Sequence, residues 1–237
     1  MIVLEDVTKV YDMGKGGTVT AVRDVTLEIA AGEFVAIVGR SGSGKTTLLN
    51  LAAGLARPTT GRVTLDGVEL WTLGDQQRSL LRNQNIGFVF QFPSLLPTLT
   101  VLENVFLPTG FGSNGHGTKP RDRARELLAS VGLADKLSAY PRQLSAGQQQ
   151  RAVIARSLIN QPRALLADEP TSNLDERTEA EIMALFHDLH ASLGLTVVLV
   201  THTRQLVSPE MRTIEMAEGR IVEASAPDRV AGELPPR

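Results

Sequence analysis

Residues 39–46 have the residue types and spacing of a phosphate-binding loop. They read Gly-Arg-Ser-Gly-Ser-Gly-Lys-Thr and lie between an apolar stretch, 34–38, and a segment rich in Leu and Ala. In the pattern G-x-x-x-x-G-K-[ST], glycines let backbone N–H groups approach phosphate oxygens, because no Cβ blocks them. Lys45 is placed to reach the β- and γ-phosphates, and the Thr46 hydroxyl to bind Mg²⁺ at a helix N-terminus. A plain Gly/Ser-rich turn would not explain Lys-Thr at this spacing, so the sequence predicts a nucleotide site.

Two adjacent carboxylates supply a second part of the predicted chemistry. Asp168 and Glu169 directly follow the apolar stretch 164–167 and precede Pro170. At the carboxyl edge of a parallel sheet, both would face the phosphates held by residues 39–46. We expect Asp168 to hold Mg²⁺, directly or through water, and Glu169 to orient the attacking water, because phosphoryl transfer depends on a positioned nucleophile. The alternative is a pair of charges that only ends a strand, and the metal-binding loop disfavours it.

A second segment, residues 144–148, combines a hydroxyl group with the start of a helix. It reads Leu-Ser-Ala-Gly-Gln, and Ser145 and the following N–H groups could bind an anion. Taken alone, this pentapeptide is better explained as a plain N-cap. Because residues 39–46 already surround the phosphates of their own nucleotide, a second anion site suggests a role at the nucleotide of a neighbouring molecule.

The elements that must position these residues follow from hydrophobic patterning. Short, wholly apolar stretches at 34–38, 164–167 and 197–200 are typical of parallel strands buried on both faces. Residues 176–193 place apolar side chains on one helical face between the last two stretches, which predicts a βαβ unit. The N-terminal third favours an antiparallel sheet. Its predicted strands are 2–7, 21–29 and 62–65.

The stretch from 98 to 160 contains no convincing strand and at least two helices, 121–131 and 146–160. We therefore expect an α/β fold: a P-loop NTPase core with a mostly parallel sheet, an N-terminal antiparallel β subdomain and an inserted α-helical subdomain. The predicted organisation is a single domain, 1–237, with a catalytic core at 1–91 and 161–226, a helical subdomain at 92–160 and a flexible tail at 227–237. The Gly-rich stretch at 108–120 is interpreted as a mobile surface loop.

Composition excludes several other classes of function. The chain has 237 residues, 42% of them hydrophobic, and 24 Lys and Arg against 26 Asp and Glu give a net charge of −2. This balance provides no global field to attract nucleic acid or an anionic membrane. Cysteine is absent, which rules out disulfides, a thiolate nucleophile and a Cys-based zinc site. We find no signal-peptide pattern and no run of ~20 apolar residues, so we expect a chain that neither spans a membrane nor enters a secretory route by itself.

In their order and spacing, these segments resemble the ATP-binding cassette (ABC) ATPases, from Tyr11 to about Ala224. The resemblance implies a homodimer whose two copies bind head to tail around two Mg-ATP. Each ATP would lie between one copy's 39–46 loop and the other copy's Ser145 segment. The resemblance also implies that ATP hydrolysis drives a separate transmembrane permease subunit.

The same resemblance assigns roles to individual residues. It matches Tyr11 to an adenine-stacking aromatic residue, Gln91 to a link between nucleotide and transmembrane partner, 172–175 to a loop crossing the dimer interface, and His202 to a γ-phosphate contact. It implies nucleotide contacts by Tyr11, Gly39, Arg40, Ser41, Gly42, Ser43, Gly44, Lys45, Thr46, Thr47, Ser145, Gly147, Gln148 and Asp175. It implies catalytic roles for Lys45, Gln91, Glu169 and His202, and Mg²⁺ contacts by Thr46, Gln91 and Asp168.

Residues 87–91, 95–105 and 168–175 resemble more narrowly the subfamily of macrolide exporters, lipoprotein-releasing ATPases and the cell-division ABC protein. This implies export or extraction of an amphipathic or lipid-linked substrate, by a subunit peripheral to the cytoplasmic side of the inner membrane that contacts the membrane through its partner and binds no nucleic acid. The alternative is an ATPase switch that gates a cell-wall hydrolase or sensor complex without solute transport. Soluble ABC proteins acting on DNA or ribosomes usually carry a second cassette or a long coiled-coil insertion, and this sequence shows neither.

The sequence departs from the family pattern at two places. Ala146 replaces the first glycine of the usual Leu-Ser-Gly-Gly-Gln, and its methyl group is tolerated if its φ angle is negative. The Gly-rich residues 110–117 lie where relatives usually have a shorter or more helical connection. We expect contacts particular to this protein there.

Overall fold

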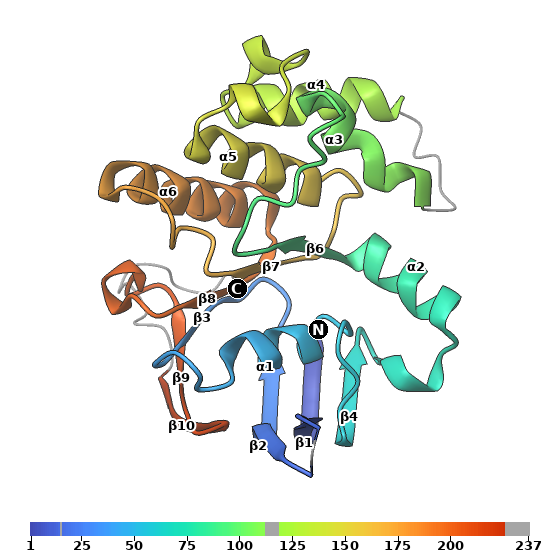
Figure 1. Cartoon of the computed structure of the whole chain (residues 1–237), viewed down its shortest axis with the longest axis vertical. Coiled ribbons are helices and arrows are strands. Elements are labelled where there is room, and N and C mark those ends of the chain that lie inside the picture. The colour runs from blue at the N-terminus through green and yellow to red at the C-terminus, as the bar shows by residue number, and fades with distance from the viewer. Residues whose placement is uncertain (15, 112–118, 226–237) are drawn as a thin grey trace, which may run out of the picture.

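The computed structural model describes residues 1–14, 16–111 and 119–225 and contains two sheets (Figure 1). The larger sheet has six strands in the order β10-β9-β3-β8-β7-β6, all parallel except β10, which pairs antiparallel with β9. Its strands are β3 (Phe34–Val38), β6 (Ile86–Val89), β7 (Ala164–Asp168), β8 (Thr196–Thr201), β9 (Arg212–Ala217) and β10 (Arg220–Ser225). The carboxyl ends of β3, β7 and β8 therefore lie at one edge, next to one another.

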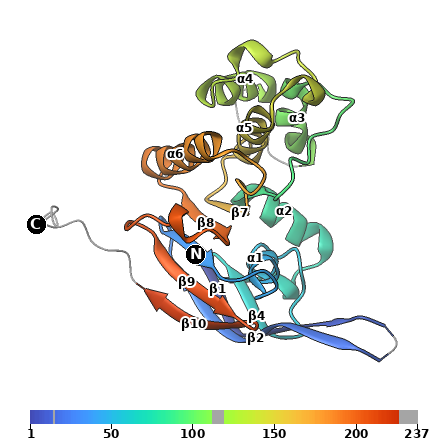
Figure 2. The same cartoon turned by 60° about the vertical axis from the view of Figure 1, so that its left-hand side comes forward.

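The smaller sheet is antiparallel and has the order β2-β1-β4-β5. Its strands are β1 (Ile2–Asp12), β2 (Thr18–Ile29), β4 (Thr60–Leu65) and β5 (Val68–Glu69). Helix α1 (Lys45–Ala52) shares one hydrophobic cluster with both sheets. In Figure 2 the β1–β2 hairpin projects from one end of the molecule, opposite a group of helices.

The helices form the other part of the structure. They are α2 (Asp75–Asn85), α3 (Val101–Phe106), α4 (Pro120–Ser130), α5 (Ala146–Ser157) and α6 (Glu176–Leu193). Helices α3, α4 and α5 pack around their own apolar cluster, while α5 and α6 cover the second face of the six-stranded sheet (Figures 1 and 2). Strand β3 shows why such strands are wholly apolar: Val35 and Ile37 join the α1 cluster, and Phe34 and Ala36 join the α6 cluster.

The predicted fold class is confirmed, with several local differences. The first two strands extend beyond their predicted ranges, because β1 and β2 form a long hairpin. Strand β6 ends at Val89, so Gln91 lies in the loop that follows it. The helix predicted over 146–160 ends at Ser157. The subdomain boundaries stay a prediction, and both the tail at 227–237 and most of the Gly-rich stretch, 112–118, lie outside the described residues.

Helix α2 and the β9–β10 hairpin are among the elements that the sequence analysis did not predict. Helix α2 has no buried residue, so no apolar stripe marked it. The β9–β10 hairpin was missed, although Ile214 and Met216 alternate in the manner of a half-buried strand. This hairpin contributes directly to the site described next.

Candidate active site

The loop between β3 and α1 is held by close backbone neighbours. A Cβ atom placed on Gly39 would lie 2.3 Å from the Met216 carbonyl oxygen, and one on Gly44 would lie 2.2 Å from the Ala21 carbonyl oxygen. Only glycine fits at these two positions, because strands β9 and β2 leave no room for a side chain. The turn between β9 and β10 adds a direct bond, in which the Gly219 N–H donates to the Ser43 carbonyl oxygen at 3.0 Å.

Lys45 is the buried cation at the centre of this loop. Its side chain is 5% exposed, and its ammonium group donates to the carbonyl oxygens of Gly39 at 2.8 Å and Arg40 at 3.1 Å. Burial lowers the pKa of Lys45, whereas the nearby Glu169 and Asp168 act in the opposite direction. A phosphate bound in the loop would add a negative charge close to the Lys45 ammonium group and would pair with it.

Thr46 and Asp168 lie side by side, as a magnesium site requires. The Thr46 hydroxyl donates to the Asp168 carboxylate at 3.1 Å, although the two residues are far apart in sequence. Burial raises the pKa of Asp168, the Thr46 hydrogen bond lowers it, and the adjacent Glu169 raises it. Between residues 1 and 225, outside the gaps at 15 and 112–118, no group of three or more His, Cys, Asp or Glu forms a metal cage. One carboxylate and one hydroxyl fit Mg²⁺ that takes its other ligands from water and phosphate.

Glu169 is held in a different direction from its neighbour Asp168 by an unusual backbone conformation. Its φ angle is 45°, and its N–H donates to the Val200 carbonyl oxygen at 2.9 Å. A carboxylate oxygen of Glu169 lies 3.1 Å from Nδ1 of His202, which follows β8 and is about half exposed. The pair therefore forms a carboxylate and imidazole unit beside Lys45, suited to orienting a water molecule at a phosphate.

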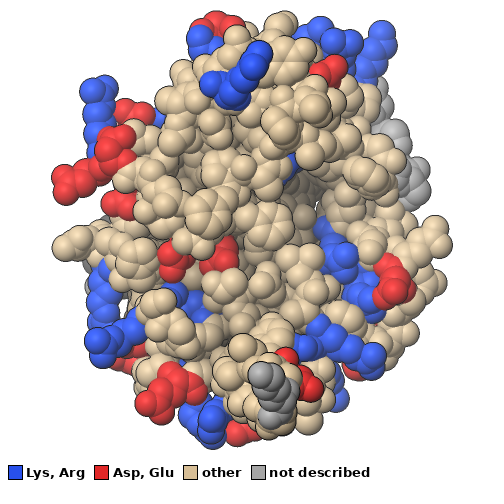
Figure 3. All heavy atoms as spheres, in the orientation of Figure 1, with Lys and Arg blue, Asp and Glu red and all other residues tan. Residues whose placement is uncertain are grey.

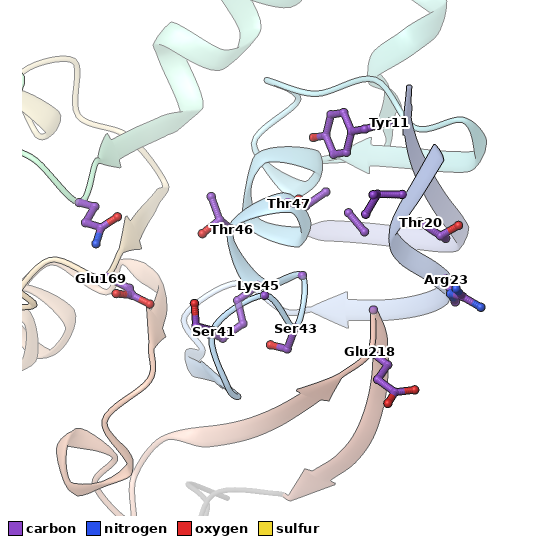
Figure 4. A pocket seen from close by; sticks show the side chains of 16 residues that line it. Tyr11, Thr20, Arg23, Ser41, Ser43, Lys45, Thr46, Thr47, Glu169 and Glu218 are labelled. Carbon is purple, nitrogen blue, oxygen red and sulfur yellow. The ribbon is translucent and has the colours of Figure 1, made fainter. Parts of the chain in front are cut away.

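A cavity of about 650 Å³ opens over the loop (Figure 4). Half-exposed Tyr11 stands at one end of it and Glu169 at the other, with Lys45 and Thr46 between them. The predicted residues that line this cavity are Tyr11, Ser41, Gly42, Ser43, Gly44, Lys45, Thr46, Thr47, Gln91 and Glu169. Gly39, Arg40 and His202 line a separate cavity of about 440 Å³ on the other side of the loop. The Ser43 hydroxyl is buried and has no partner among the described residues, which fits a phosphate contact.

Several residues of the cavity wall were missed by the sequence analysis. They are Val19, Thr20, Ala21, Arg23, Glu218 and Gly219. All belong to β2 or to the β9–β10 turn, and they reach the cavity only because these elements lie beside the loop. Their residue types carry no phosphate-binding signal. Gln91, at the opposite side, contacts Ser172 only at 3.5 Å.

The Ser145 segment is not brought to this cavity. Ser145, Gly147 and Gln148 line another hollow of about 320 Å³, together with Arg151, Thr178 and other residues. Ser145 and Gln148 form a capping box at the start of α5, so the N-cap interpretation is correct for the single chain. Ala146 is exposed in the first turn of α5 and does not have a positive φ angle, so the condition for tolerating its methyl group is met.

Asp175 is used locally in the single chain. It is the N-cap of α6, accepting hydrogen bonds from the Thr178 backbone N–H at 3.0 Å and hydroxyl at 2.7 Å. These bonds lower the pKa of Asp175. The predicted nucleotide residues are thus divided among the cavity over the loop, the cavity that Gly39 and Arg40 line, and the N-terminal ends of α5 and α6.

The fold and the pocket define a P-loop ATPase, with one carboxylate beside the Thr46 hydroxyl and a glutamate paired with a histidine. The family profile described as "ABC transporter" matches residues 22–172. The chain belongs to this ABC transporter family. It is an ATP-binding subunit and resembles the ATP-binding parts of macrolide exporters and lipoprotein-releasing ATPases. It is an ATPase that uses Mg²⁺, and the residues described above fit both.

Named relatives cover most of this chain. It is 49% identical over 92% of its length to an ABC transporter ATP-binding protein of Thermotoga maritima, also covering 92% of that protein. It is 46% identical to the lipoprotein-releasing system ATP-binding protein LolD of Geobacter metallireducens, covering 92% of this chain and 96% of that one. A macrolide export ATP-binding/permease protein MacB of Syntrophobacter fumaroxidans is 42% identical over 99% of this chain, which spans only 32% of MacB.

A solved structure supports the fold and the enzyme class. The ATP-binding cassette MJ0796, described as a dimeric post-hydrolysis state bound to ADP and Pi, has a TM-score of 0.86 and 42% identity, covering 95% of this chain and 98% of that one. No helix among residues 1–14, 16–111 and 119–225 combines the length and the apolar character that a membrane crossing needs.

Proposed function

We propose that this chain is the ATP-hydrolysing motor of an ABC transporter and works as a head-to-tail homodimer on a transmembrane permease. The main support for this proposal is that the Lys45 loop and the Ser145 helix end line two separate cavities. A single chain completes only the Lys45 side. A second copy, turned head to tail, supplies Ser145 to the open side of the first nucleotide, and MJ0796 is a dimeric relative.

In this dimer each predicted site residue has a defined task. Lys45 holds the β- and γ-phosphates, and Thr46 and Asp168 hold Mg²⁺ together with Gln91. Glu169 orients the attacking water while His202 contacts the γ-phosphate. Tyr11 stacks on adenine, and Ser145, Gly147, Gln148 and Asp175 act on the partner copy's nucleotide. The proximity of Glu169 and His202, at 3.1 Å, supports the hydrolytic assignment.

The permease docks, in this proposal, on the apolar surface that follows β6. Phe90, Phe92 and Leu96 are 43%, 66% and 44% exposed. A nearby groove of about 220 Å³ is lined by Leu55, Phe88, Arg82 and others. In Figure 3 charged side chains of both signs stand mainly at the rim of one face, and uncharged side chains fill much of its middle. Exposed apolar side chains in one region commonly mark an interaction site.

Hydrogen bonds from two helices hold the segment that carries this apolar surface. Arg156 of α5 donates to the Ser94 carbonyl oxygen at 2.6 Å and to its hydroxyl at 2.7 Å. Buried Asn104 bonds both the N–H and the carbonyl oxygen of Leu96. Leu95 packs against two hydrophobic clusters, so Leu96 is the better position for testing docking.

We further propose a peripheral location on the cytoplasmic side of the inner membrane and an amphipathic or lipid-linked substrate, which is exported or extracted. The names of the LolD and MacB relatives support this choice. The near-neutral net charge gives no support to a nucleic-acid partner.

The test is capture and reconstitution of the complex. The tagged chain is purified from detergent-solubilised native membranes, and its co-purifying membrane protein is reconstituted with it in proteoliposomes. We expect ATP-dependent movement of a fluorescent lipopeptide, lost with Glu169→Gln. Leu96→Glu should keep the ATPase activity of the isolated chain but abolish capture. Stimulated ATP turnover without movement of any amphipathic probe would favour the switch function, and capture unaffected by Leu96→Glu would contradict this docking surface.

A further inference from the structure

Thr178 lies between the two helix ends that carry Ser145 and Asp175. It is the third residue of α6, and its hydroxyl donates to one Asp175 carboxylate oxygen at 2.7 Å. Its backbone N–H donates to the other oxygen at 3.0 Å. Thr178 therefore fixes the orientation of the Asp175 side chain and the path of the chain entering α6.

The methyl group of Thr178 faces the other helix end. A Cβ atom placed on Gly147 would lie 2.4 Å from Thr178 Cγ2, and its next nearest neighbours would be two other Thr178 side-chain atoms, at 3.8 and 3.9 Å. Gly147 is buried and does not have a positive φ angle, so no backbone strain demands glycine there. The Thr178 methyl group occupies the place that a side chain at position 147 would need.

A second contact joins the same two helices further along. Arg151 of α5 forms an ion pair with Glu181 of α6 at 3.0 Å. Both side chains are partly exposed, so this ion pair contributes little to the packing of α5 against α6. At the N-terminal ends of α5 and α6, Gly147 faces the Thr178 side chain.

We infer that Thr178 is a positioning residue that holds the Ser145 segment and Asp175 at a fixed distance from each other. This rests on the proposed function, in which both helix ends act on the second copy's nucleotide. The hydroxyl of Thr178 positions Asp175, and its methyl positions α5 through Gly147. In this inference, position 147 is glycine because a side chain there would clash with Thr178. The alternative explanation is that a side chain there would clash with the phosphate of the second copy's nucleotide.

Second-site rescue separates these two explanations. Gly147→Ala should lower the kcat for ATP hydrolysis by about tenfold or more and weaken ATP-dependent dimerisation, because the new Cβ displaces α5 from α6. Thr178→Ser removes the methyl and keeps the hydroxyl, so alone it should lower kcat by only about two- to fivefold, because α5 loses its contact with the methyl group while Asp175 stays in place. The double variant should recover to within about threefold of Thr178→Ser, because the two sites are in contact and their effects are not additive.

Two further measurements make the result decisive. Thr178→Val keeps the methyl group, so Gly147→Ala/Thr178→Val should remain as inactive as Gly147→Ala. The ATP concentration for half-maximal dimerisation, measured by gel filtration with Glu169→Gln added to every variant, should be restored together with the melting temperature only in the serine double variant. If the serine double variant recovers neither kcat nor dimerisation, Gly147 serves the phosphate directly and the inference is wrong. The assay needs no permease, so failure of the transport proposal leaves its result unaffected.

Discussion

The two ends that we propose to bind phosphate are built in opposite ways. The loop at 39–46 is clamped by strands β2 and β9, contains a buried lysine and faces two carboxylates. The helix end at Ser145 has no charged group of its own, and its side chains satisfy one another in a capping box. The first end is preorganised for a charged ligand within one chain, whereas the second end, in the proposed dimer, becomes a site only beside the nucleotide of the other copy.

The largest expected effect concerns chemistry at the first end. Glu169→Gln should lower kcat by about 10²-fold or more while ATP remains bound, because it removes the water-orienting carboxylate and keeps the side-chain shape. The variant should accumulate as a dimer with ATP, seen by gel filtration with light scattering. His202→Ala tests the other member of the Glu169–His202 pair in the same assays. Near-normal turnover in Glu169→Gln would remove this residue from the catalytic role.

The clamping of the first end predicts a smaller but selective effect on nucleotide binding. Gly44→Ala should weaken ATP binding by about tenfold or more, because its Cβ would meet the Ala21 carbonyl oxygen at 2.2 Å. Gly42→Ala, whose Cβ meets nothing within 4 Å, is the control and should weaken binding less. Fluorescent-nucleotide titration measures both. Equal losses would show that conformation alone, and not the close approach, determines the glycine at 44.

The two helix caps near the second end should differ in their dependence on pH. Hydrogen bonds from Thr178 lower the folded-state pKa of Asp175, so the stability that Asp175 contributes is present above its ordinary value of 3.8 and is lost as pH falls through the lowered folded value. The urea midpoint difference between wild type and Asp175→Ala should therefore shrink below pH 4. Ser145→Ala removes an uncharged cap, and its effect should be independent of pH over the same range. Parallel behaviour of both variants would contradict this assignment.

The smallest expected effect is at Ala146. Its exposed position in a helical first turn predicts that Ala146→Gly changes kcat by less than about twofold. Steady-state hydrolysis by the isolated chain measures this. A several-fold increase would show that the methyl group crowds the partner copy's nucleotide.

The sequence predicted which residues meet at the first end, because their signal is local. Lys45 and Thr46 are fixed by spacing within one loop, and Asp168 and Glu169 follow directly from a buried strand. Arg23 and Glu218 could not be predicted, because they reach the cavity only through strand pairing and a turn far along the chain. Helix α2 escaped prediction because its apolar residues are the adjacent Leu80 and Leu81, which form no repeating hydrophobic period. The contact of Thr178 with Gly147 depends on how two helices pack, which their separate sequences do not reveal.

The bond from the Gly219 N–H to the Ser43 carbonyl oxygen also bears on biosynthesis. A ribosome makes residues 39–46 early, but β9 and its turn, which brace that loop, come near the end of the described chain. A nascent chain that ends before β9 has the phosphate-binding sequence without its support. The loop should therefore acquire its braced shape only once β9 and its turn have been made.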